Sequence, residues 1–162
     1  MLMQTVLAIL YNAVLLVVCS YAALRGGRPE RHGAAITLMA SAASGAIQFW
    51  SVAYWEPAHF IIVSIDIAAT AGFFWLAVST IRYWPVWAFG FALANVFIGA
   101  AGAVLPNITL FAYSSGVVLY AYLGLGALAL GTFRLPRDAS PVLRNGSRGL
   151  WQQHQNENRT KT

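Results

Sequence analysis

Charged residues are scarce in this chain of 162 residues. Only 9% of the residues are Asp, Glu, Lys or Arg, whereas 59% are hydrophobic. About a quarter of a typical soluble domain is charged. So few charges could not cover the surface of a soluble enzyme, and so apolar a composition excludes an intrinsically disordered protein. The composition therefore indicates a protein that crosses a membrane several times.

Cysteine is represented once, by Cys19, which excludes a disulfide framework and a metal site built from several cysteines. The sequence also lacks a phosphate-binding Gly-Lys-Ser/Thr loop, a nucleophile elbow and a His-Glu-x-x-His motif. Hydrolytic or ATP-driven chemistry thus has no recognisable machinery. We expect a protein that is not an enzyme and that holds neither a cofactor nor a metal.

Five apolar segments are each close to the roughly 20 residues that cross about 30 Å of hydrocarbon. They cover about residues 2–24, 34–54, 58–80, 86–105 and 110–133. No positive charge precedes the first segment, so we interpret it as a retained span rather than a signal peptide. The sequence predicts an all-α bundle of five transmembrane helices over residues 1–133.

Basic residues are confined to alternate connections between these segments. Of the ten Lys and Arg residues, three lie in the 25–33 loop, one is Arg82, and six lie in the tail, residues 134–162. The positive-inside rule then predicts an outside N-terminus and a cytoplasmic C-terminus. The polar tail contains Pro136 and Pro141 and is predicted to be a disordered cytoplasmic segment.

This distribution of charge favours a lipid bilayer as the partner and argues against nucleic acid. Arg134 and Arg137 follow the fifth apolar segment directly and are the candidates for binding anionic lipid head groups. The alternative is that the two residues serve only as signals of topology.

Several motifs of this chain are shared with one group of membrane proteins. They are Asp66, the turn Arg82-x-Trp84-Pro85-x-Trp87, Gly90-Phe91 and Gly131-Thr132. Over about residues 60–135 the chain resembles a group of small, uncharacterised multi-span proteins of the inner membrane of Gram-negative bacteria. The resemblance implies an inner-membrane location and the fold, and it carries no function. Where that family has a Thr-His pair late in the fourth span, this chain has Ile98-Gly99.

Asp66 is the one acid or base well inside a predicted span. A carboxylate near the centre of a bilayer costs about 2.5–3.5 kcal/mol on insertion scales. Either the group is protonated, or it has polar partners, or it lines a wet cavity. Steps of three and four residues place Glu56, His59, Asp66 and Thr70 on one helical face, which forms a polar stripe leading inward from the outer surface.

Two interpretations of this stripe stay open. A proton or ion pathway would use it, with Asp66 as the titrating group. Alternatively, Asp66 hydrogen-bonds Asn95, Gln48, Asn12 or a serine and holds helices or subunits together, which we favour. Glu56 and His59 could also ligate a metal, but a site needs three or four ligands and no second motif supplies them.

Pairs of small residues four positions apart favour close helix packing. They are Ser41/Gly45, Ala68/Gly72, Gly90/Ala94, Gly99/Ala103 and Ala127/Gly131. We therefore expect a non-enzymatic accessory or structural subunit, which associates with a partner membrane protein or with copies of itself. The alternative is a small proton-coupled transporter or channel component that uses Asp66.

Overall fold

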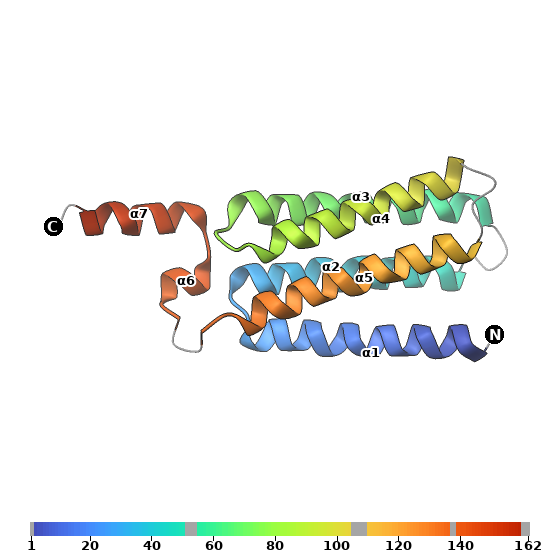
Figure 1. The fold of residues 1–162 in the computed structure, drawn as a ribbon, viewed down its shortest axis with the longest axis horizontal. Coiled ribbons are helices and arrows are strands. Elements are labelled where there is room, and N and C mark those ends of the chain that lie inside the picture. The colour runs from blue at the N-terminus through green and yellow to red at the C-terminus, as the bar shows by residue number, and fades with distance from the viewer. Residues whose placement is uncertain (1, 51–54, 105–109, 137–138, 160–162) are drawn as a thin grey trace.

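The computed structural model describes residues 2–50, 55–104, 110–136 and 139–159, and in them the side chains of 6–47, 60–101, 116–136, 139–157 and 159. All regular elements in these ranges are helices. The five long ones run side by side along one direction (Figure 1), and they are α1 (Leu2–Arg25), α2 (Arg28–Trp50), α3 (Trp55–Ser79), α4 (Trp84–Val104) and α5 (Leu110–Phe133). The all-α expectation is confirmed.

The five helices pack in three layers. α3 and α4 form one outer layer, α2 and α5 form the middle, and α1 covers the opposite side (Figure 1). α1 contacts both α2 and α5, whereas α3 contacts α2 and α4, and α4 packs along α5. The interior of the bundle is therefore enclosed by all five helices.

Four of these helices contain segments that are long and apolar enough to span a membrane. They are Val6–Arg25, Phe60–Ser79, Trp84–Ala101 and Gly116–Phe133. α2 is less hydrophobic because it begins with charged residues and continues with Ser, Thr, Gly and Ala. Spanning by α2 therefore stays a prediction, although its contacts with α1, α3 and α5 place it in the same bundle.

The surface of the bundle is apolar. Val17, Phe97 and Leu130 are each at least 60% exposed, and the described core consists mainly of Leu, Ala and Cys side chains such as Leu76, Leu128 and Cys19. Lipid, rather than water, suits large apolar side chains on the outside of a helical bundle.

The first loop is shorter than the sequence predicts. The 25–33 segment was expected to be a loop, but α2 begins at Arg28 and leaves only Gly26 and Gly27 between the helices. The Gly27 N–H donates to Glu30 Oε2 over 2.9 Å, which is one half of a capping box. Pro29 occupies the first turn, where its missing N–H costs nothing. The residues that indicated a loop are those of a helix start.

The predicted disorder of the tail is not confirmed. The structure instead has two helices there, α6 (Pro141–Asn145) and α7 (Arg148–Arg159). Ser140 caps α6 by accepting from the Leu143 N–H, Pro141 opens the helix, and Gly146 ends it at a φ of 63°. The Pro, Ser and Gly residues of the tail thus delimit a helix rather than prevent one.

Candidate functional site

Asp66 is one helical turn from Val63, the residue of α3 that faces Gly99 of α4. A methyl group on Gly99 of α4 would lie 3.5 Å from Val63 Cγ2 of α3, which fixes how these antiparallel helices are paired. One turn further along both helices, this pairing places Asp66 at the level of Asn95. Asp66 is half-buried, and Asn95 Oδ1 is fully buried without a hydrogen-bond partner.

Polar side chains from α1, α2 and α5 meet at a similar depth. The Tyr11 and Ser41 hydroxyls share a hydrogen bond of 3.5 Å, and the Tyr11 ring meets the Tyr122 ring edge-on with centroids 5.4 Å apart. Tyr11 also lies within range of electrostatic interaction with Asp66. All five helices therefore contribute to one polar layer, which we define as Tyr11, Ser41, Asp66, Asn95 and Tyr122.

This polar layer lies near the middle of the bundle. Each member is 11 to 14 residues from the end of its helix on the side of the Gly26–Gly27 loop. At a rise of 1.5 Å per residue this is roughly 16–21 Å, close to the centre of a hydrocarbon core about 30 Å thick.

Other polar residues considered in the sequence analysis form hydrogen bonds within their own helices or lie outside the described residues. The Thr70 hydroxyl donates to the backbone carbonyl of Asp66 over 2.7 Å, so it serves its own helix. The Asn12 amide is exposed and donates to the Ala8 carbonyl over 2.8 Å. The side chains of Glu56, His59 and Gln48 lie outside the described residues, so the outer half of the stripe stays a prediction.

A second polar cluster, which the sequence analysis missed, lies at one end of the bundle. We call it the Glu30 cluster, and it consists of Glu30, Arg82 and Trp84. Glu30 is 0% exposed. Trp84 Nε1 donates to Glu30 Oε1 over 3.1 Å, and Arg82 Nε forms an ion pair with the same oxygen at 3.6 Å. A buried carboxylate is destabilising unless it is paired, and with the Gly27 N–H on Oε2 both oxygens of this one have partners.

Trp84 holds three helices together at this cluster. Its indole lies between Gly33 of α2 and Gly131 of α5, and a Cβ atom at either glycine would collide with the ring. The side chain is 6% exposed, and the neighbouring Pro85 is fully buried in the first turn of α4. The Arg-x-Trp-Pro turn therefore has a packing role at the junction of α2, α4 and α5.

The same cluster anchors the tail. Arg82 Nη2 donates to the Leu143 carbonyl over 2.9 Å, and the Ile81 N–H donates to the Gly146 carbonyl over 3.0 Å. Thr80 and Ser147 form an isolated antiparallel bridge. Gly27 lies directly against the Arg144 carbonyl. The α3–α4 loop and the start of α2 thus form the seat on which α6 rests.

Small-residue packing takes two forms. Gly72 lies against Ile36, Gly99 against Val63 and Gly131 against Trp84, whereas Gly45 and Gly90 face open space. Of the predicted pairs, some therefore act within the bundle, and the Gly45 and Gly90 positions are open to lipid or to another protein.

Basic side chains surround the same end of the bundle. Arg134 is exposed just beyond α5, and Arg25, Arg28 and Arg31 are exposed around the first loop. The Arg25 guanidinium lies 5.9 Å from the centroid of the Tyr21 ring. Arg137 lies outside the described residues. Binding of lipid head groups by Arg134 and Arg137 stays a prediction. The exposure of Arg134 is compatible with it.

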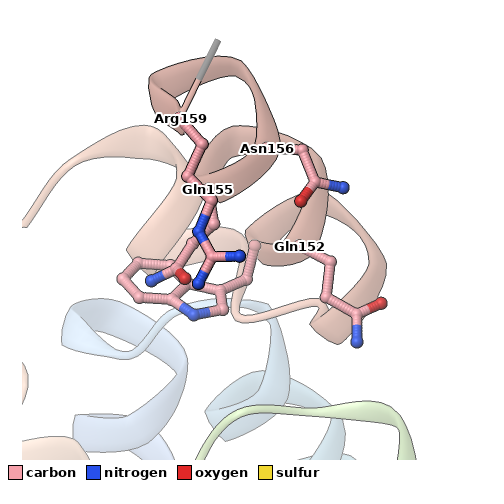
Figure 2. Close-up of a pocket in the computed structure, with 5 residues that line it drawn as sticks. Gln152, Gln155, Asn156 and Arg159 are labelled. Carbon is pink, nitrogen blue, oxygen red and sulfur yellow. The ribbon is translucent and has the colours of Figure 1, made fainter. Parts of the chain in front are cut away.

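A shallow hollow lies on α7, where Gln152, Gln155, Asn156 and Arg159 project from a single helix (Figure 2). Its lining is amide and guanidinium groups and Trp151, without a carboxylate, thiol or imidazole. Within the described part of the chain, no three His, Cys, Asp or Glu residues gather closely enough to hold a metal ion.

Comparison with known proteins finds no matching family, no matching curated protein and no matching solved structure. The resemblance to the small inner-membrane proteins therefore stays a prediction based on the motifs given above.

Proposed function

We propose that this chain is a non-enzymatic accessory subunit of a bacterial inner membrane, with its N-terminus outside and its C-terminus in the cytoplasm. Its partner is another protein of that membrane or a second copy of itself. The observation that carries the proposal is the anchored tail. α6 is seated on the Glu30 cluster, and α7 extends beyond the end of the bundle (Figure 1).

The anchoring of the tail supports an adaptor role, because ordering a tail costs conformational entropy that must be offset by contacts. Fixing the backbone of one residue costs roughly 1–2 kcal/mol, and here the Arg82–Leu143 and Ile81–Gly146 hydrogen bonds offset part of it. The result is that α6 is held at a defined place, and α7 follows it directly with Gln152 to Glu157 exposed. A partner would meet a prearranged surface and would lose less entropy on binding.

Photo-crosslinking in cells tests the subunit proposal. A crosslinking amino acid at Gln152 or Gln155 of α7 is expected to capture one protein, which also co-purifies in mild detergent at a fixed stoichiometry. The matched control is Tyr83, which is 85% exposed at the same end of the bundle but lies outside α7. Scattered products at all three positions, with no stoichiometric partner, would contradict an adaptor role for α7.

A second candidate function is supported by the polar layer. Asp66 at mid-bundle, with Tyr11, Ser41 and Asn95 around it, is the arrangement expected of a small proton-coupled transporter or channel component. Proton flux into proteoliposomes tests this. Flux through the wild type that is lost in Asp66→Asn and retained in Glu157→Gln would support it, and equal flux through empty vesicles would refute it.

A further inference from the structure

The side-chain oxygen of Asn95 is buried without a hydrogen-bond donor, so the polar layer needs a further donor beside it. Asn95 Oδ1 is fully buried and accepts no hydrogen bond. An unsatisfied buried acceptor is destabilising, so native structures rarely leave one without a partner. A donor is therefore needed at this level between α3 and α4.

The surrounding side chains leave few candidates for that donor. The Tyr11 and Ser41 hydroxyls share a hydrogen bond in which either can be the donor, and the Thr70 hydroxyl donates to a carbonyl of its own helix. Asp66 is the residue of α3 that the pairing of Val63 with Gly99 brings to the level of Asn95. An ionised carboxylate cannot donate a hydrogen bond, but a carboxylic acid can.

No described cation lies close enough to stabilise a carboxylate here. α3 packs on α2 and α4. α4 contains no acidic or basic residue. The charged residues of α2 all lie at its start, from Arg28 to His32, which is more than two helical turns from Ser41. The other titratable groups that face the layer are Tyr11 and Cys19 of α1 and Tyr122 of α5. A phenol or a thiol carries no positive charge, so none of these groups can pair with a carboxylate as a cation.

We infer that the Asp66 carboxyl group carries a proton at neutral pH and donates its hydrogen bond to Asn95 Oδ1, which makes a proton-binding site between α3 and α4. The acid supplies the donor that Asn95 lacks, and neutralisation removes most of the cost of a charge in hydrocarbon. Release of the proton to water removes this donor, so the protonated form satisfies Asn95 Oδ1 between α3 and α4 and the ionised form leaves that oxygen without its partner.

This inference rests on the polar layer of the second candidate function, and it is tested without measuring transport. The chain has two aspartates, Asp66 and Asp138. Cell-free synthesis of the Asp138→Asn variant with aspartate labelled with ¹³C at the side-chain carboxyl, directly into lipid nanodiscs, leaves Asp66 as the single labelled carboxyl group. Infrared spectroscopy at pH 7 then reports its protonation through the isotope-shifted carbonyl band.

We expect the labelled band at the frequency of a carboxylic acid. In Asn95→Ala it is expected to move to higher frequency, because the acid no longer donates to Asn95. Asn12→Ala is the matched control, since that amide is exposed and bonded within its own helix, and it is expected to leave the band unchanged. A labelled carboxylate band at pH 7, or an acid band unaffected by Asn95→Ala, overturns the inference.

The two proposals fail separately. An ionised Asp66 combined with flux that is lost in Asp66→Asn would remove the proton site proposed here but keep a pathway that uses the aspartate. A protonated Asp66 bonded to Asn95, without any flux, would keep the site and refute transport. The protonation state is measured with Asn95 intact, so it is obtained even where Asn95→Ala does not fold.

Discussion

At the scale of single residues, Glu30 is the most constrained polar group that the structure describes. Its two carboxylate oxygens are engaged by the Gly27 N–H, Trp84 Nε1 and Arg82. Breaking a buried ion pair on one side leaves an uncompensated charge and typically costs 3–5 kcal/mol. We therefore expect Glu30 to contribute strongly to stability, although Asp66 is the acid that stands out in the sequence.

Replacing this carboxylate should destabilise the protein. Glu30→Ala is expected to lower the free energy of unfolding by about 3–5 kcal/mol, because Arg82 and Trp84 Nε1 lose their partner. Thermal unfolding in detergent measures the effect. Glu157→Ala, on the exposed face of α7, is the control and should lie within about 0.5 kcal/mol of the wild type. An equal effect of the two substitutions would contradict the role given to Glu30.

The two glycines beside Trp84 offer a second test at this scale. Gly131→Ala should destabilise the protein by about 1–3 kcal/mol, because the added methyl group overpacks the indole. Gly90→Ala is the matched control; a methyl group there would have no atom within 4 Å, so the alanine should stabilise the helix by up to about 1 kcal/mol. Gly33 faces the outer ring atoms Cη2, Cζ3 and Cζ2 of Trp84, which phenylalanine lacks. Combining Gly33→Ala with Trp84→Phe should therefore recover part of the loss caused by Gly33→Ala, and additivity of the two would exclude a direct contact.

At the scale of elements, α6 depends on Gly146. This residue has a φ of 63°, and a methyl group there would also press against Pro29 Cγ at 2.7 Å. Both the helix end and its seat on α2 thus need glycine at this position.

Undocking of the tail is the expected result of Gly146→Ala. The Ile81 amide, which donates to the Gly146 carbonyl, should then lose its protection from hydrogen exchange. Mass spectrometry in nanodiscs measures this. Gly149→Ala is the control, because its methyl group would meet only Ser147 Oγ at 4.0 Å. Unchanged protection at Ile81 in Gly146→Ala would show that α6 is seated by other contacts.

The long helices could be predicted from hydropathy, because crossing hydrocarbon requires long apolar runs whatever their packing. α1, α3, α4 and α5 accordingly begin and end within a few residues of the predicted segments. The start of α2 could not be predicted in this way, because the Gly27–Glu30 cap uses residues that are as frequent in loops as at helix ends. The Gly-Arg-Pro-Glu order was the available indication.

The Glu30 cluster lay beyond sequence reasoning for a different reason. Glu30, Arg82 and Leu143 are far apart in the chain, and each occupies a segment whose composition is typical of a solvent-exposed loop. Asp66 was identified because it interrupts an apolar run, and its placement opposite Asn95 follows only once the pairing of α3 with α4 is known.

At the scale of the whole molecule, the open question is how many helices cross the membrane. α2 contacts α1, α3 and α5, and an odd number of crossings fits the alternation of basic loops. If all five helices cross and the N-terminus lies outside, as we propose, the Glu30 cluster and the tail would lie on the cytoplasmic side.

Cysteine accessibility tests this topology. In a Cys19→Ser background, a cysteine at Arg31 should react with a water-soluble maleimide added from the cytoplasmic side, whereas one at Gly45, which is exposed on the bundle surface, should be shielded by lipid. A reporter fused after Thr162 should be active in the cytoplasm. Rapid labelling at Gly45, or a periplasmic reporter, would refute five crossings with a cytoplasmic C-terminus.

The spacing of the Glu30 cluster also sets an order of biosynthesis. Glu30 and its donor Trp84 are 54 residues apart, and Arg82 and Leu143 are 61 apart. At 5–20 residues per second, the ribosome makes Trp84 roughly 3–11 s after Glu30. During that interval the carboxylate has neither Trp84 nor Arg82 as a partner, so the first two helices lack this contact, and α6 can dock on the cluster only after all five long helices have been synthesised.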